Sequence, residues 1–223
     1  MEYTHRAKYS LKILNRTIYL DFLIQNYYIQ KIIRQMYQQI YNTLEMITPL
    51  SDNLKEYLNE HFKIIQLPKK HLLLKEGTIC KNIYFIADGF TRAYYWKDNK
   101  EMTSWFFGSG EVIISVHSFF TQSPSAENIQ LLEDSILVSL TYHQLQFVYK
   151  TYPEFNTVGR VLTEQYYIRS EERAIALRML SAKERYDNLL NTHPQILQKV
   201  SLGQIASHLG ITQETLSRVR AQK

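Results

Sequence analysis

The sequence predicts an α+β fold in three consecutive parts: a jelly-roll-like β-roll, a long helix and a C-terminal helix-turn-helix. Three observations carry this prediction. Short apolar runs separated by turn residues fill residues 63–140, as is typical of a small β-sandwich or barrel. A helical repeat of apolar residues follows over 154–180, where the period changes from that of strands to that of a helix. Residues 199–223 then carry the apolar spacing of two short helices crossing at a tight turn.

Composition places the chain among ordinary globular proteins. Its 223 residues are 45% hydrophobic and 21% charged, and no apolar run approaches the roughly 18 residues of a membrane helix. Cys80 is the single cysteine of the sequence, which excludes a disulfide framework and any cluster that needs several thiolates from one chain. We therefore expect a cytoplasmic protein that binds no metal and needs no cofactor.

Residues 1–43 differ from the rest of the chain. They are rich in Tyr, Ile, Gln, Asn and Lys and contain no Gly or Pro. No small-residue cleavage site follows an apolar stretch, so a signal peptide is not indicated. Two interpretations stay open: Met36 is the natural start and residues 1–35 are an upstream extension, which we favour, or the segment is a functional arm.

The central part is predicted to begin with a short helix over 48–62, with Ser51 as its N-cap. Turn residues such as Asp88-Gly89 and Asp98-Asn99 then separate eight short runs. The expected strands are 63–67, 72–75, 83–87, 91–97, 102–107, 112–115, 129–132 and 135–140. A short helix over 142–151 should end at Pro153. Most of the bulky aromatics of these strands are interpreted as core, with an apolar pocket as the alternative.

The long helix, about 154–180, has apolar residues that approximate a heptad repeat, with polar Gln165 and Glu172 inside the seam. An exposed helix of this length is most easily covered by the same helix of a second copy. The residues expected at this homodimer interface are Val158, Val161, Leu162, Gln165, Ile168 and Ile175. Packing against the chain's own β-roll is the alternative.

The C-terminal residues fit a helix-turn-helix almost position by position. If Leu202 is position 1, apolar or small residues occupy the constrained positions 4, 5, 8, 9, 10, 15 and 18; these are Ile205, Ala206, Leu209, Gly210, Ile211, Leu216 and Val219. Ser201 and Gln204 have the spacing of a capping box, and Thr212 is a suitable N-cap for the second helix. A motif of this kind generally places its second helix in the DNA major groove.

The second helix has one continuous polar face. Arg donates two hydrogen bonds to guanine, Glu accepts from cytosine, and Ser or Gln reaches a base or a phosphate. The predicted DNA-binding residues are Thr212, Gln213, Glu214, Ser217, Arg218 and Arg220. The alternative is an ordinary solvated face, which the match at every constrained position disfavours.

The order of these parts resembles the CRP/FNR family of bacterial transcription regulators. The resemblance covers residues 44–223. It rests on the runs LKEG at 74–77, IYFI at 83–86, Gly110-Glu111, LSAKERY at 180–186 and IASHLGITQETLSR at 205–218. The last two resemble the branch of the family common in Bacteroidetes.

This resemblance implies four segments: an N-terminal extension (1–43), a cyclic-nucleotide-binding-like β-roll (44–152), a long dimerisation helix (153–180) and a helix-turn-helix DNA-binding domain (181–223). It also implies a homodimer that binds an inverted repeat in double-stranded DNA and works with RNA polymerase. In the family, an E-x-x-S-R motif reads the operator, and the matching residues here are Glu214, Ser217 and Arg218.

The sequence departs from the cyclic-nucleotide-binding members in one segment. Those members carry an Arg that pairs with the cyclic phosphate, whereas residues 122–128 contain no Arg or Lys, and Glu127 would repel an anion. We therefore expect no tight binding of cAMP or cGMP. An unknown small-molecule effector remains possible, with Gly110, Glu111 and Ser125 as its candidate pocket.

Two other classes of protein are alternatives to a DNA-binding regulator. An enzyme is not indicated, because the sequence has no H-x-H metal spacing, nucleophile elbow, P-loop or dinucleotide fingerprint. A ligand-binding or protein-interaction β-roll with a helical tail that does not bind DNA is the stronger rival. The intact polar face of the second C-terminal helix favours the DNA-binding regulator over this rival.

Overall fold

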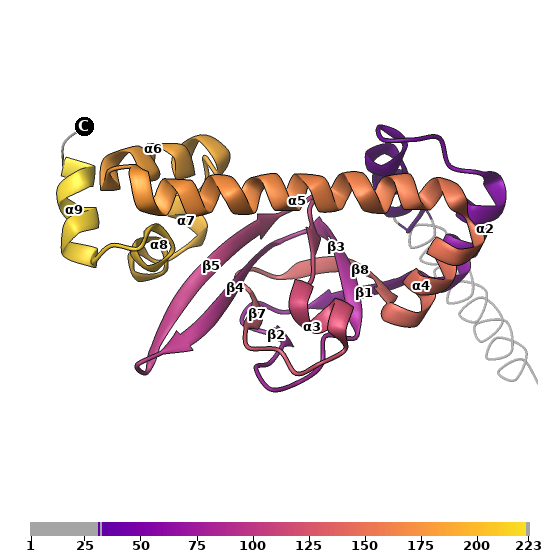
Figure 1. The fold of residues 1–223 in the computed structure, drawn as a ribbon, viewed down its shortest axis with the longest axis horizontal. Helices are drawn as coiled ribbons and strands as arrows, with labels where there is room; N and C mark the ends of the chain where they lie inside the picture. Colours follow the sequence, from indigo (N-terminus) through magenta and orange to yellow (C-terminus); the bar gives the residue numbers. More distant parts are fainter. Residues whose placement is uncertain (1–30, 32, 222–223) are drawn as a thin grey trace, which may run out of the picture. The chain divides into compact units, whose positions relative to one another are not determined.

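The computed structural model describes residues 31 and 33–221 (Figure 1). The chain divides into two compact units, residues 1–39 and 40–223. The second unit contains all the described strands and helices α2–α9. The status predicted for residues 1–35 therefore lies almost wholly outside the described residues and stays a prediction.

Two antiparallel four-stranded sheets form the β-roll, here defined as β1–β8. One sheet has the order β1-β8-β3-β6 and the other β2-β7-β4-β5. The strands are β1 (Lys63–Leu67), β2 (Leu72–Leu74), β3 (Asn82–Asp88), β4 (Phe90–Lys97), β5 (Lys100–Gly108), β6 (Val112–Ile113), β7 (Asn128–Leu131) and β8 (Ser135–Thr141). The predicted mixed fold is confirmed, and each predicted strand is present to within two residues at either end.

Turn chemistry sets the path between the strands. Asp98 and Asn99 join β4 to β5 with φ of 50° and 58°, the left-handed values that a two-residue hairpin turn needs. Gly89 lies between β3 and β4 with φ +133°, and a Cβ there would lie 2.2 Å from the Ser135 hydroxyl oxygen. Only glycine fits this position, because a side chain would collide with Ser135 at the start of β8.

Short helices frame the β-roll. Helix α2 (Asp52–His61) begins at Ser51, whose hydroxyl accepts a hydrogen bond from the backbone N–H of Leu54 as predicted. Helix α4 (Tyr142–Thr151) begins with a capping box. Helix α3 (Val116–Thr121) was not predicted. The expected strand 112–115 is correspondingly shorter, because Ser115 already begins this helix.

Helix α5 (Pro153–Met179) is a single helix of 27 residues. Its first turns pack on α4, where a Cβ at Gly159 would lie 2.4 Å from the Tyr149 hydroxyl. Val158 has no exposed surface. The placement of Val158 at a dimer interface is therefore wrong, since this side chain is already buried inside its own chain.

The C-terminal helices, here defined as α6 (Ala182–Thr192), α7 (Ile196–Lys199), α8 (Leu202–Leu209) and α9 (Gln213–Ala221), share a core with the β-roll. Phe90, Phe106 and Leu132 of the β-roll belong to the same buried cluster as the apolar residues of these helices. Because apolar burial is the main source of stability, the two parts are held together by a continuous core as well as by polar contacts.

Candidate nucleic-acid interface

Helices α8 and α9 pack against each other through the residues that the sequence indicated. Ile205, Ala206 and Leu209 of α8 are buried, as are Leu216 and Val219 of α9. Gly210 follows α8 in the left-handed conformation with φ +65°, and its N–H donates to the carbonyls of Ala206 and Ser207. This turn lets α9 start after only three intervening residues, 210–212.

Side-chain caps fix where both helices begin. The Ser201 hydroxyl accepts from the Gln204 N–H at 3.3 Å, and the Gln204 side-chain oxygen accepts from the Ser201 N–H at 3.2 Å. The Thr212 hydroxyl accepts from the Thr215 N–H at 3.2 Å. Unpaired donors at the two helix starts are thereby satisfied, so the orientation of the side chains on α9 is set by the chain itself.

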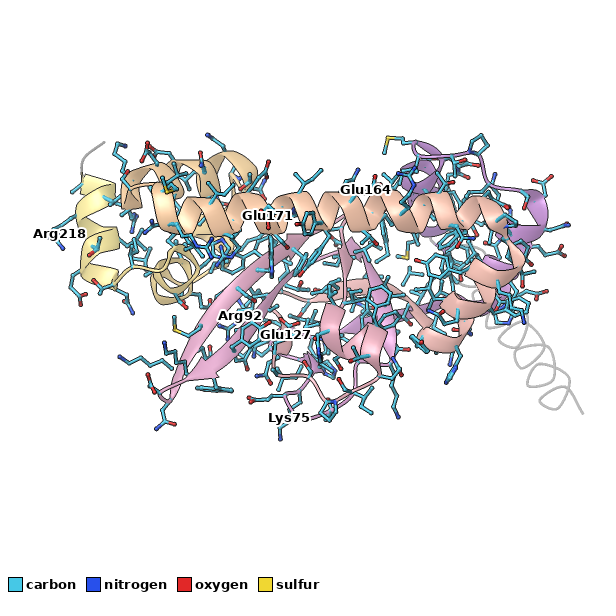
Figure 2. The ribbon with its side chains drawn as sticks, viewed as in Figure 1. Lys75, Arg92, Glu127, Glu164, Glu171 and Arg218 are labelled. Atoms are coloured by element: carbon cyan, nitrogen blue, oxygen red, sulfur yellow. The ribbon has the colours of Figure 1, made fainter. Side chains whose placement is uncertain are left out.

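The predicted DNA-binding residues share one property: all are exposed. They are Thr212, Gln213, Glu214, Ser217, Arg218 and Arg220. Figure 2 shows Arg218 projecting from the outer side of α9. Its guanidinium donates to the Thr215 hydroxyl at 3.2 Å, a single bond that leaves most of its donors free for a base edge.

Glu214 is suited to accept hydrogen bonds at neutral pH. A hydrogen bond with the Thr212 side chain lowers the pKa of the Glu214 carboxyl, and the positive charge of Arg218 lowers it further. The face of α9 therefore presents an ionised acceptor one helical turn from a permanently charged donor. This pair of groups can distinguish base pairs in the major groove.

One side of α8 docks on the free edge of strand β5. The Ser207 hydroxyl accepts from the backbone N–H of Thr103 at 2.9 Å and donates to the backbone carbonyl of Glu101 at 3.0 Å. Inside the β-roll, the buried Arg92 forms an ion pair with the Glu101 side chain; Figure 2 shows Arg92 there. No local pattern in the sequence marks Ser207, because its partners lie more than 100 residues earlier.

The candidate effector residues have partners within the chain. The Glu111 carboxylate accepts from the Arg169 guanidinium of α5 at 2.7 Å and from the Gly108 N–H at 2.7 Å. Ser125 is buried, and its hydroxyl lies 3.1 Å from that of Ser115. Gly110 adopts φ +90° in the turn after β5. The bonds of Glu111 and Ser125 and the turn conformation of Gly110 thus each serve the fold of the chain.

Neither of two surface hollows includes those residues. A hollow of about 580 Å³ lies between α2 and the start of α5, lined by Ser51, Asn53, Glu56, Tyr57, Glu60, Thr151, Tyr152 and Glu154. A hollow of about 240 Å³ lies between the β-roll and the C-terminal helices, lined by Phe90, His193, Pro194, Gln195, Ile196 and Lys199. The three candidate residues thus do not converge on either opening.

Glu127 turns into the β-roll, where Figure 2 labels it. Burial raises the pKa of its carboxyl, although hydrogen bonds with the side chains of Ser115 and Tyr95 oppose this shift. No ion pair found among residues 31 and 33–221 includes Glu127. A buried carboxyl without a cation disfavours an anionic ligand beside it.

Residues expected at the homodimer interface lie mostly on the open side of α5. Ile168 and Ile175 each expose 54% of their surface, and Gln165 is exposed too. Val161 and Leu162 are half-buried. Apart from Val158, each of these side chains keeps some exposed surface, and their place at a homodimer interface stays a prediction.

Within the described part of the chain, no group of three or more His, Cys, Asp or Glu side chains is placed to hold a metal ion. The helices in the same residues are all too short or too polar to cross a membrane.

The comparisons with known proteins agree with this architecture. Residues 64–152 match the family model of the cyclic nucleotide-binding domain. No curated protein matches the sequence. Among solved structures, the c-di-GMP responsive global regulator CLP of Xanthomonas campestris is 18% identical, with a TM-score of 0.63 over 77% of this chain and 91% of that chain.

Two further structures are similar to the same degree. FixK2 from Bradyrhizobium japonicum is 18% identical, with a TM-score of 0.62 over 72% of this chain and 83% of that one. A regulator of the CRP/FNR family from Eubacterium rectale is 15% identical, with a TM-score of 0.62 over 76% and 82%. Residues 64–152 thus match the cyclic nucleotide-binding domain, and the chain has the fold of CRP/FNR transcription regulators.

Proposed function

We propose that this chain is a sequence-specific DNA-binding transcription regulator of the CRP/FNR type, acting as a homodimer on an inverted-repeat operator. The observation that carries the proposal is the outer face of α9. Its polar side chains are exposed, while Leu216 and Val219 on the other side are buried against α8. A helix held this way presents a fixed pattern of donors and acceptors to a major groove.

Each side chain on this face has a role that its chemistry suits. Arg218 reads guanine through O6 and N7, and Glu214 accepts from the amino group of cytosine. Ser217 and Gln213 reach a neighbouring base or a phosphate. Thr212 and Arg220, at the two ends of the helix, contact the DNA backbone and fix its register.

The open side of α5 supplies the homodimer interface in this proposal. Ile168 and Ile175 form its apolar part, with Val161, Leu162 and the polar Gln165 along the same seam. Burial of these side chains against the same helix of a second copy stabilises the dimer. A two-fold dimer presents two copies of α9 and requires two half-sites about one helical turn apart.

Cyclic nucleotides are not the effector in this proposal. The buried carboxyl of Glu127, which is hydrogen-bonded to the side chains of Ser115 and Tyr95, occupies the segment in which cyclic-nucleotide-binding members carry an Arg. Calorimetry with cAMP should detect no binding, and micromolar affinity would contradict this assignment. Gly110, Glu111 and Ser125 stay only a prediction for another small-molecule effector, and their in-chain bonds favour a structural role. RNA polymerase is the proposed protein partner; no catalysis and no cofactor are proposed.

Selection of the purified protein against randomised duplex DNA, without added ligand and at a stated salt concentration, tests the proposal. Enrichment of an inverted repeat with a fixed spacing would support a dimeric regulator that needs no effector. A second selection with cell extract follows if nothing is enriched. Failure of both would favour the rival function, a ligand-binding or protein-interaction module whose helical tail does not bind DNA.

A further inference from the structure

Two arginines from different helices bind the C-terminal end of α8. Arg173 of α5 donates from Nη2 to the backbone carbonyl of His208 at 3.0 Å. Arg185 of α6 donates from Nε to the carbonyl of Leu209 at 2.9 Å and from Nη1 to the carbonyl of Leu180 at 2.5 Å. The last carbonyls of a helix lack partners within it and carry partial negative charge, so both guanidinium groups are well placed there.

Arg173 also contacts the side chain of His208. Its Nη1 lies 3.2 Å from His208 Nε2. Because a guanidinium only donates, Nε2 must accept, and the proton of the neutral ring lies on Nδ1. Nδ1 is buried, and a hydrogen bond with the backbone of Ser104 favours the protonated ring. The neutral ring therefore accepts from Arg173 through Nε2.

Arg173 has no carboxylate partner among the ion pairs of the described residues. Burial lowers the pKa of its guanidinium to about 10. Its charge is balanced instead by helix-end carbonyls and by the ring of Trp105 on β5, whose centroid lies 5.7 Å from the Arg173 Cζ. Removal of Arg173 would therefore act mainly on the end of α8.

The same stretch of α5 contacts the turn between α8 and α9. Leu177 Cδ2 lies 3.3 Å from the position that a Cβ on Gly210 would take. On the opposite side, Ser207 is bonded to the edge of β5. Helix α8 is thus bound by α5, by α6 and by β5, and α9 follows it because the two helices share a buried core.

We propose that Arg173 is a positioning residue, which fixes the α8–α9 pair relative to α5 and so sets the half-site spacing that the homodimer accepts. This inference rests on the proposed function, since α5 is the proposed dimer helix and α9 the proposed reader. Two properties of the operator are then controlled by separate residues. The face of α9 sets the half-site sequence, and Arg173 sets the distance between the half-sites.

The test uses the full-length protein and duplexes that carry two copies of the selected half-site, with the spacer varied one base pair at a time. The variants are Arg173→Met, which keeps the apolar stem and loses the guanidinium, and Arg173→Lys, which keeps one charged donor. The matched control is Arg178→Met, because Arg178 is an exposed arginine of the same helix.

The wild-type protein should bind the duplex with its preferred spacer about tenfold more tightly than duplexes with other spacers. This difference has the size that one mismatched base pair causes. Arg173→Met should reduce this preference to about threefold or less without changing the preferred half-site, and Arg173→Lys should be intermediate. Arg178→Met should keep the wild-type preference. An Arg173→Met protein that folds and keeps the tenfold preference would overturn the proposal.

Hydrogen exchange without DNA separates this inference from the proposed function. The amides of Gly210 and Ile211 are bonded to carbonyls of the last turn of α8, and they should exchange faster in Arg173→Met than in wild type or Arg178→Met. Unchanged exchange would overturn the inference even if the wild type binds an inverted repeat. Faster exchange in a protein that binds no DNA would refute the proposed function while leaving the α5–α8 coupling intact. Should Arg173→Met fail to fold, Arg173→Lys is judged by the same two measurements.

Discussion

The outer face of α9 and the segment before β7 use their polar side chains in opposite ways. On α9, Arg218 and Ser217 point outward, and a single in-chain bond holds the Arg218 guanidinium. In the segment before β7, Ser125 and Glu127 are buried, and their side chains are bonded to neighbours in the β-roll. Polar groups that remain free are available to a partner, whereas groups already bonded inside the chain serve the fold.

In the proposed function, the polar groups that recognise a partner therefore lie on the C-terminal helices and not in the segment before β7. The β-roll matches the cyclic nucleotide-binding domain, but Glu111 and Ser125 of the candidate effector pocket are bonded within the chain.

The largest effect is expected from Leu216→Ala, which removes a buried side chain between α9 and α8. It should lower the free energy of unfolding by about 2–5 kcal/mol, through lost burial and the cavity left behind. Chemical denaturation measures this loss. Ser217→Ala, at the exposed neighbour, should stay within about 0.5 kcal/mol of wild type; equal losses for both would show that α9 is not packed as described.

Arg218→Ala should weaken binding to the selected operator by about 1–3 kcal/mol and relax the sequence preference at one base pair. Stability should be unaffected, because the side chain is exposed. Fluorescence anisotropy on matched and single-mismatch duplexes measures both effects. Arg220→Ala is the comparison, since loss of a phosphate contact should weaken all sequences about equally.

Acid should destabilise the C-terminal helices through His208. Burial, the charge of Arg173 and the nearby His193 lower the pKa of His208 to about 3, from 6.5 in the unfolded chain, and the backbone of Ser104 opposes them. Below pH 6.5 the unfolded state takes up a proton that the folded state does not, so stability falls as the pH falls. The loss is about 1.4 kcal/mol per pH unit between pH 6.5 and 3.

His208→Gln, which still accepts a hydrogen bond and does not titrate, should flatten this part of the pH profile. Denaturation at pH 7, 6 and 5 supplies the measurement. A profile as steep as that of wild type would show that another group is responsible.

Glu127→Gln should have the smallest effect on stability. The pH dependence that Glu127 contributes has the opposite sign to that of His208. Burial raises the pKa of the Glu127 carboxyl in the folded state. The folded protein therefore gains stability from the protonated carboxyl at a pH below the pKa of the unfolded chain. This contribution is lost as the pH rises through the pKa of the folded state. The neutral amide should therefore increase the stability at pH 7 and change it little at pH 4. A loss of stability at pH 7 would indicate that the ionised carboxylate is needed.

The sequence predicted those features that depend on residues close together in the chain. The α8–α9 pair follows from the local spacing of Ile205, Gly210 and Leu216, and the capping box at Ser201 marks the start of α8. Helices α3 and α7 were missed because they have only six and four residues, and neither has a side-chain cap to mark its start.

Contacts between distant segments were beyond the reach of the sequence. A heptad pattern indicates an apolar stripe on a helix but not which segment covers it. The pattern therefore places Val158 against a second copy, although this side chain is buried inside the chain. The bonds from Arg173 to His208 and from Ser207 to β5 join residues 35 or more positions apart, and no local pattern marks either of them.

The most direct test of the account is a side-by-side selection of the wild-type protein and Arg218→Ala against randomised duplex DNA at the same salt concentration. We predict that the wild type enriches an inverted repeat, and that the variant enriches a repeat of the same spacing with one position per half-site degenerate. An identical repeat for both proteins, or two unrelated single sites, would contradict the assignment of α9 as the reader of a dimeric regulator.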